Sequence, residues 1–274
     1  MAITLNNGFQ MPIIAIKDLI IESIKIGFRH FDCASDYKNE AEVGEALCEA
    51  IKTGLVKREE LFITTKARAK WDFDFFFNYL WNTDHGHVVE ACKKSLKKLQ
   101  LDYLDLYLVH FPISIRHTGI GATGSPLDED GVLDIETNIS LETTWHAMED
   151  LVSLGLVRSI GISNYDIFLT RDCLAYSKIK PAVNQIETHP YFQRESLGIA
   201  EKYKKTAAQI VLRWGIQRNT LVIPKTSKFE RLKENFKVLE FELAKEDMDV
   251  IQAIDKNYRS NIQPAKFWGI DLYA

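Results

Sequence analysis

The sequence lacks the features that mark several large classes of protein. No two of its four cysteines have CxxC spacing; they lie far apart, at positions 33, 48, 92 and 173 of 274 residues. This spacing predicts reduced core thiols rather than zinc ligands or a disulfide framework. The N-terminus has no charged-then-apolar signal pattern, and no apolar run approaches the roughly 18 residues of a membrane helix. We therefore expect a soluble, cytoplasmic protein with no membrane partner.

An excess of positive charge is also absent. The 34 Lys and Arg residues against 38 Asp and Glu residues give a net charge of −4 and a pI near 6.0. Nucleic acid is therefore not an expected partner. The hydrophobic share of 46% is ample for a large core, and no linker or repeat divides the chain. We expect a single domain over residues 1–274, with an N-terminal hairpin at about 3–12 and a C-terminal tail at about 256–274; the oligomeric state stays open.

Short apolar strands alternate with amphipathic helices, a pattern that predicts a parallel sheet covered by helices. Asn39, with Glu42 three residues later, is expected to cap the helix that starts at Glu40. We expect strands at 28–31, 61–66, 104–110, 157–164, 182–187 and 221–225, and helices at 18–25, 40–53, 86–99, 140–154, 165–177, 200–213, 230–239 and 245–255.

Chemically active side chains stand where several of these strands end. In a parallel barrel all such ends open onto one mouth. Each residue alone has an ordinary explanation, such as a solvated lysine or a local hydrogen bond, but their coincidence favours an active site. The residues are Asp32, Lys66, His110, Ser163, Asn164 and Lys225, with Gln185 inside a further strand and Tyr37 in the loop after Asp32.

An acid, a phenol, a lysine and a histidine together suit carbonyl reduction. A tyrosine hydroxyl, with a pKa of about 10, is a poor proton donor at neutral pH. A nearby ammonium such as Lys66 can lower that pKa by roughly 1–3 units. Asp32 could hold the ammonium in place, and a neutral His110 could orient a carbonyl oxygen. The set predicts protonation of an oxygen by Tyr37 as hydride arrives at its carbon.

The motifs around these residues resemble those of the aldo-keto reductases, and among them most of all the plant aldose-6-phosphate reductases (the mannose-6-phosphate reductase and sorbitol-6-phosphate dehydrogenase group). The resemblance covers nearly the whole chain. It implies an α/β fold, the TIM (β/α)8 barrel, and NADPH-dependent reduction of the aldehyde of mannose-6-phosphate or glucose-6-phosphate to the alditol phosphate. The motifs are at residues 31–34, 37–40, 63–66, 108–112, 161–165, 184–187 and 222–226.

The resemblance also implies a role for each motif residue, and no metal. Tyr37 would be the general acid, Lys66 would lower its pKa, Asp32 would pair with Lys66, and His110 would orient the substrate. The other residues would hold NADP(H): Ser163, Asn164 and Gln185 at the nicotinamide carboxamide, Lys225, Thr226 and Arg231 at the adenosine 2′-phosphate, and Glu234 and Asn235 at the adenine.

Four further residues are candidates for contact with the sugar-phosphate substrate. Lys38, beside Tyr37, could meet the phosphate or be a solvated lysine at a helix start, and the two interpretations are about equally favoured. Trp81 is expected near the substrate, and Arg116 and His117 are weaker candidates for the phosphate.

Three departures from the family pattern predict an incomplete barrel. The first strand after Pro12 is shortened or lost, residues 67–80 are an insertion, and the step from Leu197 to Gly198 omits a helix, the seventh strand and the loop that covers the cofactor's pyrophosphate. The strands at Gln185 and Val222 should then be unpaired edges.

Two alternatives to an active reductase remain open. One is a catalytically impaired, aberrantly spliced or mispredicted product that acts at most as a cofactor- or partner-binding protein. The other, a metal-dependent barrel lyase or hydrolase, is disfavoured because no compact His, Asp and Glu ligand set stands at the strand ends.

Overall fold

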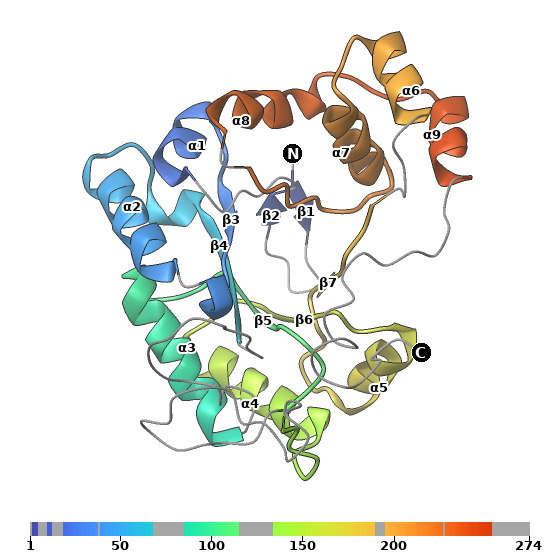
Figure 1. Cartoon of the computed structure of the whole chain (residues 1–274). Coiled ribbons are helices and arrows are strands. Elements are labelled where there is room, and N and C mark those ends of the chain that lie inside the picture. Colours follow the sequence, from blue (N-terminus) through green and yellow to red (C-terminus); the bar gives the residue numbers. More distant parts are fainter. Residues whose placement is uncertain are drawn as a thin grey trace.

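The computed structural model describes residues 2–4, 10–12, 19–37, 39–67, 85–114, 134–189, 195–226 and 228–253. Its centre is a curled five-stranded sheet in the order β3-β4-β5-β6-β7, in which all neighbours are parallel (Figure 1). The strands are β3 (His30–Asp32), β4 (Phe62–Ala67), β5 (Leu106–Val109), β6 (Ile160–Ser163) and β7 (Asn184–Gln185). The predicted parallel sheet is thus confirmed for five of the six expected strands.

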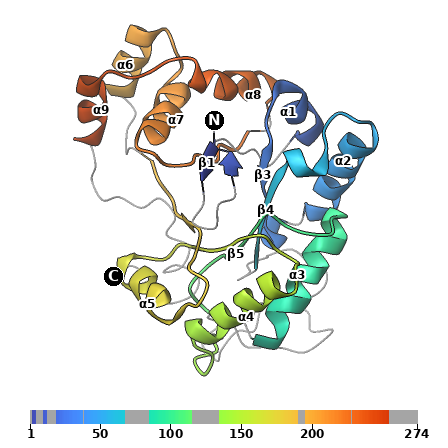
Figure 2. The same ribbon diagram turned by 180° about the vertical axis from the view of Figure 1, so that it is seen from behind.

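Helices connect the strands and cover the outside of the sheet (Figures 1 and 2). The first five are α1 (Ile20–Ile26), α2 (Glu40–Lys52), α3 (His85–Leu99), α4 (Leu141–Ser153) and α5 (Ile167–Tyr176). The later ones are α6 (Glu195–Tyr203), α7 (Ala207–Gln217), α8 (Phe229–Phe236) and α9 (Lys245–Gln252). Single 3-10 turns are η1 (Ser35–Tyr37), η2 (Arg58–Glu60) and η3 (Lys237–Leu239). At the N-terminus, β1 (Ala2–Thr4) pairs antiparallel with β2 (Gln10–Pro12), where a hairpin is expected.

The sheet is apolar on both faces, as expected for parallel strands covered by helices. Successive side chains of a strand point to opposite faces. On β5, Tyr107 and Val109 therefore join the main core, whereas Leu106 and Leu108 pack in a smaller cluster with Phe62. A further cluster, which includes Ile210, Trp214 and Ile251, lies among α6, α7 and α9.

The single helix predicted to run through 200–213 is wrong, because the structure contains two helices there. Lys204 has a φ of 53° and ends α6. Thr206 then starts α7 with a capping box, in which its side chain accepts from the Gln209 amide and Gln209 bonds back. A capping box satisfies two amides that a helix start leaves without partners, so the Thr206-x-x-Gln209 spacing was the signal for this break.

The predicted capping of α2 by Asn39 is also wrong. Asn39 occupies the position before α2, but its side chain makes no capping hydrogen bond, and its backbone has a φ of −112° and a ψ of 10°. Capping side chains normally require an extended backbone at this position. The helix instead begins with the buried side chain of Glu40.

Residues 221–225 do not form the predicted strand of the sheet. Leu221 and Val222 nevertheless pack against the cores, so their apolar side chains are partly buried without a strand ladder. A strand needs a hydrogen-bonding neighbour, and β7 is the edge of the described sheet. The prediction of an edge at Gln185 is confirmed, whereas Val222 belongs to no strand of this sheet.

The α4 helix fixes the chain that leads into β7. Glu149, which is buried, accepts hydrogen bonds from the Lys178 and Ile179 amides at 2.6 and 2.8 Å and from His146 Nδ1 at 2.9 Å. Trp145 Nε1 donates to the Ile179 carbonyl at 3.0 Å. Burial raises the pKa of Glu149, but the hydrogen bonds from His146, Ile179 and Lys178 outweigh burial and leave the pKa below its ordinary value of 4.5.

This lowered pKa predicts acid sensitivity. A carboxylate whose pKa is lowered by folding stabilises the native state above its unfolded pKa and loses this contribution as the pH falls through the folded pKa. We expect the wild type to lose unfolding free energy between about pH 5 and about pH 3 more steeply than Glu149→Gln, measured by urea unfolding. A constant difference between the two proteins would contradict this.

The α2 and α3 helices meet at Gly44 without room for a side chain. A Cβ at Gly44 would overlap the backbone of Lys98 and Leu99, and backbone atoms cannot rotate away. By contrast, a Cβ at Gly198 in α6 would meet nothing within 4 Å.

Substituting these two glycines should therefore have opposite effects. We expect Gly44→Ala to lower the free energy of unfolding by roughly 1–3 kcal/mol, because overpacking outweighs the better helix propensity of alanine. The matched control Gly198→Ala should be neutral or stabilising by up to about 1 kcal/mol. Urea unfolding of both variants measures the free energy of unfolding. If the two substitutions change it equally, α2 and α3 can move apart at Gly44 without cost, which contradicts this prediction.

Candidate active site

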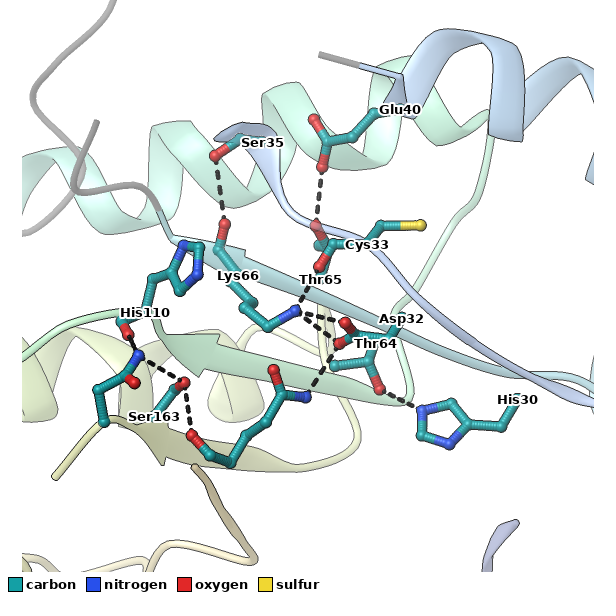
Figure 3. A network of polar contacts seen from close by, with 12 residues as sticks. His30, Asp32, Cys33, Ser35, Glu40, Thr64, Thr65, Lys66, His110 and Ser163 are labelled. Atoms are coloured by element: carbon teal, nitrogen blue, oxygen red, sulfur yellow. Dashed lines mark hydrogen bonds and ion pairs between the residues drawn. The ribbon is translucent and has the colours of Figure 1, made fainter. Parts of the chain in front are cut away.

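Lys66 and Asp32 form a buried ion pair at the C-terminal ends of β4 and β3. The side chains are 0% and 1% exposed, and Lys66 Nζ lies 2.6 and 2.7 Å from the two carboxylate oxygens (Figure 3). Lys66 Nζ also donates to the Cys33 carbonyl at 2.9 Å. An ammonium has three N–H donors, so these three acceptors match it fully. Burial without such partners would be costly for either charge.

Gln185 joins this pair from the opposite edge of the sheet. Its Nε2 donates to Asp32 Oδ1 at 3.1 Å, although β3 and β7 are the first and last strands in the sheet order. The sheet must therefore curl until its two edges face each other. This hydrogen bond does not test the predicted contact of Gln185 with the nicotinamide carboxamide. It shows that the side-chain amide of Gln185 already donates to Asp32.

Tyr37 lies between the ammonium and an imidazole. The Lys66 Nζ is 5.2 Å from the centroid of the Tyr37 ring, and the His110 ring is 6.1 Å away at an interplanar angle of 87°. Both Tyr37 and His110 are partly exposed. Asp32 and Cys33 accept all three N–H groups of Lys66. The interaction of the Lys66 charge with the Tyr37 phenol is therefore electrostatic and involves no hydrogen bond.

Ser163 and Asn164 connect the ends of β5, β6 and β7. Asn164 has a φ of 62°, a left-handed conformation that asparagine tolerates. Its Nδ2 donates to the His110 carbonyl at 2.8 Å and to Ser163 Oγ at 3.2 Å, and Ser163 Oγ donates to the Gln185 carbonyl at 2.7 Å. The structure thus brings seven of the eight predicted residues into one network or its immediate surroundings, Lys225 being the eighth: Asp32, Tyr37, Lys66, His110, Ser163, Asn164 and Gln185.

The residues predicted to hold the adenosine end of a dinucleotide lie on the loop before α8 and along α8 itself. Lys225 and Arg231 are exposed, and Glu234 is half-buried. Thr226 and Asn235 are buried, and Thr226 Oγ1 accepts from the Lys228 amide at 3.1 Å. Lys38, Trp81, Arg116 and His117 lie outside the described residues, as does the predicted insertion beyond Ala67.

Sequence reasoning missed two buried side chains beside the site. Glu40, taken only as the first residue of a helix, is 1% exposed and accepts from Thr65 Oγ1 at 2.8 Å. His30, on β3, bonds through Nε2 to Thr64 Oγ1 at 2.9 Å. The signal available in the sequence was the pair of threonines inside an otherwise apolar strand, since buried hydroxyls need partners.

The four cysteines are free thiols; Cys33, Cys92 and Cys173 are buried, as predicted for core thiols, whereas Cys48 is half-buried. Burial raises the pKa of Cys92 to about 12 and that of Cys173 to about 11, so both stay protonated near neutral pH. The described residues contain no cluster of three or more His, Cys, Asp or Glu side chains that could hold a metal ion. No helix among them has the length and apolarity to cross a bilayer.

Comparisons with known proteins identify the family. The Aldo/keto reductase family profile matches residues 16–205 and 195–256. The chain belongs to the aldo-keto reductase family. An NADP-dependent D-sorbitol-6-phosphate dehydrogenase from Malus domestica is 55% identical, with 99% of each chain covered. An NAD(P)H-dependent D-xylose reductase from Candida tropicalis is 38% identical, with 94% of each chain covered.

A solved structure supports the same family and fold. The aldose reductase from Schistosoma japonicum superimposes with a TM-score of 0.87 at 35% identity, over 100% of this chain and 98% of that one. The predicted fold class, an aldo-keto reductase barrel, is confirmed by this match. The described residues form a curled sheet of five strands, which is compatible with the predicted incompleteness. The prediction of an oxidoreductase of this family is likewise confirmed.

The same comparisons agree with the deletion that the sequence predicts at the step from Leu197 to Gly198. The family profile matches in two segments that meet at 195–205, around the junction of Leu197 and Gly198. The alignment with the Malus protein spans 321 positions against 274 residues here, so at least 47 positions have no counterpart in this chain.

The ion pair predicts a large cost when only one partner is removed. Lys66→Met leaves the buried Asp32 carboxylate without its cation, and we expect a loss of roughly 3–5 kcal/mol of unfolding free energy. Lys66→Met combined with Asp32→Asn should recover most of that loss. As a control, Lys245 and Asp249 pair at 2.6 Å on the surface, and Lys245→Met should leave the unfolding free energy almost unchanged, because exposed ion pairs contribute little. Equal urea unfolding curves for Lys66→Met and wild type would contradict this interpretation.

Proposed function

We propose that this protein reduces the aldehyde of a sugar 6-phosphate to the alditol phosphate with NADPH, mannose-6-phosphate and glucose-6-phosphate being the candidate substrates. The observation that carries the proposal is the 55% identity over 99% of the chain to an NADP-dependent D-sorbitol-6-phosphate dehydrogenase. The arrangement of Tyr37, Lys66, Asp32 and His110 supports it, because it suits proton transfer to a carbonyl oxygen.

The residues present fit a dinucleotide phosphate at two places. Near the Lys66–Asp32 pair, Ser163, Asn164 and Gln185 supply the polar groups that a carboxamide needs. On the loop before α8 and in its first turn, Lys225 and Arg231 are exposed cations that suit a 2′-phosphate. Thr226, Glu234 and Asn235 belong to the same loop or helix. When bound, NADPH would supply the hydride.

In the proposed mechanism the protein's own residues handle the proton. His110 orients the substrate carbonyl toward Tyr37, and the Tyr37 hydroxyl gives its proton to the carbonyl oxygen as the carbon is reduced. The Lys66 ammonium, held by Asp32, stabilises the phenolate that remains. The half-buried position of Tyr37, with its ring 5.2 Å from Nζ, supports this role.

Removing the phenol hydroxyl should abolish turnover. We expect Tyr37→Phe to lower kcat for aldehyde-dependent NADPH oxidation by roughly 10²–10⁴-fold, the usual contribution of a positioned acid. NADPH binding, followed by fluorescence, should be unchanged because the variant removes only a proton donor. Retained activity would refute the mechanism.

The alternative of an impaired product also has support, namely the edge position of β7 and the missing alignment positions. Fluorescence titration and turnover of the wild type separate the two cases. NADPH binding without turnover favours a cofactor-binding protein, and neither binding nor a cooperative thermal transition favours a product that does not fold.

Lys38 is the proposed contact for the substrate's phosphate. If an ammonium meets that phosphate, Lys38→Ala should raise KM for glucose-6-phosphate and leave the KM for glucose unchanged, because only the first substrate carries the negative charge. The measurement is kcat/KM for both sugars. If Lys38→Ala leaves the ratio of kcat/KM for glucose-6-phosphate to kcat/KM for glucose unchanged, Lys38 is a solvated lysine that does not contact the phosphate.

A further inference from the structure

The segment that carries Tyr37 is attached to β4 at two points beside the lysine. Ser35 Oγ donates to the Lys66 carbonyl at 3.2 Å, and Glu40 Oε1 accepts from Thr65 Oγ1 at 2.8 Å (Figure 3). Ser35 precedes Tyr37 by two residues and Glu40 follows it by three, while their partners are adjacent on β4. Two attachments fix both the position and the rotation of the segment between them.

Glu40 holds its place at an energetic cost. Its side chain is 1% exposed, and no described residue donates a hydrogen bond to its Oε2. Lys98 Nζ lies 3.8 Å from this oxygen, on a side chain that is itself 53% exposed. Glu40 is the first residue of α2, where the helix dipole favours a negative charge. A buried carboxylate with one oxygen left over is a poor stabilising element, so its position calls for another explanation.

We propose that Ser35 and Glu40 are positioning residues, which hold η1 against β4 so that the Tyr37 phenol stays beside the Lys66 ammonium. This inference rests on the proposed function, in which that spacing makes the phenol a usable acid. The attraction between an ammonium and a phenolate weakens with distance. Loosening either attachment therefore lets Tyr37 move away and brings its ionisation closer to that of an ordinary tyrosine.

The first test measures Tyr37 itself and needs no turnover. The difference between the phenolate absorbance titrations of the protein and of its Tyr37→Phe variant isolates this one tyrosine. In the Thr65→Val background, where the difference is taken against Thr65→Val combined with Tyr37→Phe, the midpoint should move up by roughly 0.5–1 pH unit. This is part of the roughly 1–3 units by which a neighbouring ammonium lowers a pKa. Thr65→Ser keeps the hydroxyl and should titrate like the wild type.

A matched control lies next to Thr65 on the same strand. Thr64 is equally buried, but its hydroxyl bonds to His30 and not to the Tyr37 segment. Thr64→Val should therefore leave the Tyr37 midpoint in place. Ser35→Ala, which removes the other attachment, should shift it upward as Thr65→Val does, and it serves as the test if Thr65→Val does not fold.

Turnover gives an independent measurement. Thr65→Val should lower kcat by roughly 10-fold or more with an unchanged KM for NADPH, because misplacement affects the reacting group and not cofactor binding. The descending limb of its pH–rate profile should move to higher pH, which a purely structural defect would not cause.

The outcomes separate this inference from the proposed function. If Tyr37→Phe retains turnover, the function fails, while the titration still tests the attachments. If Tyr37→Phe is inactive but Thr65→Val and Ser35→Ala move the Tyr37 midpoint no further than Thr64→Val does, the positioning role is overturned and the function stands.

Discussion

The buried ion pair of Lys66 and Asp32 fixes the geometry of the other polar groups in the site. An ammonium without solvent must have its donors matched, and here the match is made by both Asp32 oxygens and the Cys33 carbonyl. The strand register makes this possible. Asp32 pairs with Thr64 across β3 and β4, and Lys66 follows two residues later on the same face of β4. The pair thus requires the parallel register that the hydrophobic pattern sets.

The residues of the candidate site lie on or next to the strands that the structure describes. Asp32, Tyr37, Lys66, His110, Ser163 and Gln185 all belong to β3–β7 or the loops that follow them, and these five strands form one continuous ladder. The departures from the family pattern that the sequence predicts fall after Pro12, at residues 67–80 directly after Lys66, and at the junction of Leu197 and Gly198. The predicted loss of the seventh strand concerns the part of the barrel that follows β7, whereas the residues proposed to handle the proton lie on or next to strands that the structure describes.

Sequence reasoning predicted most of the fold, and its failures have physical reasons. Apolar strands that end on polar residues were recognisable, and the ends of β3, β4, β5 and β6 hold the predicted side chains. The strand expected at 221–225 failed because an apolar pattern reports burial and does not report whether a neighbouring strand exists. The break between α6 and α7 was missed although Thr206 and Gln209 carry its signal. The roles of Ser35, Thr65 and Glu40 depend on contacts between segments about 25 to 31 residues apart, which periodicity cannot show.

The bond from Gln185 to Asp32 has a consequence for the barrel as a whole. In a closed barrel, a complete backbone ladder joins the first and last strands, whereas here the described edges are bridged by one side-chain amide and one carboxylate. A hydrogen bond to a charged group makes a net contribution of roughly 1.5–3 kcal/mol to stability. A ligand that competes for that carboxylate or that amide must displace this hydrogen bond, so its net binding free energy is smaller by that contribution.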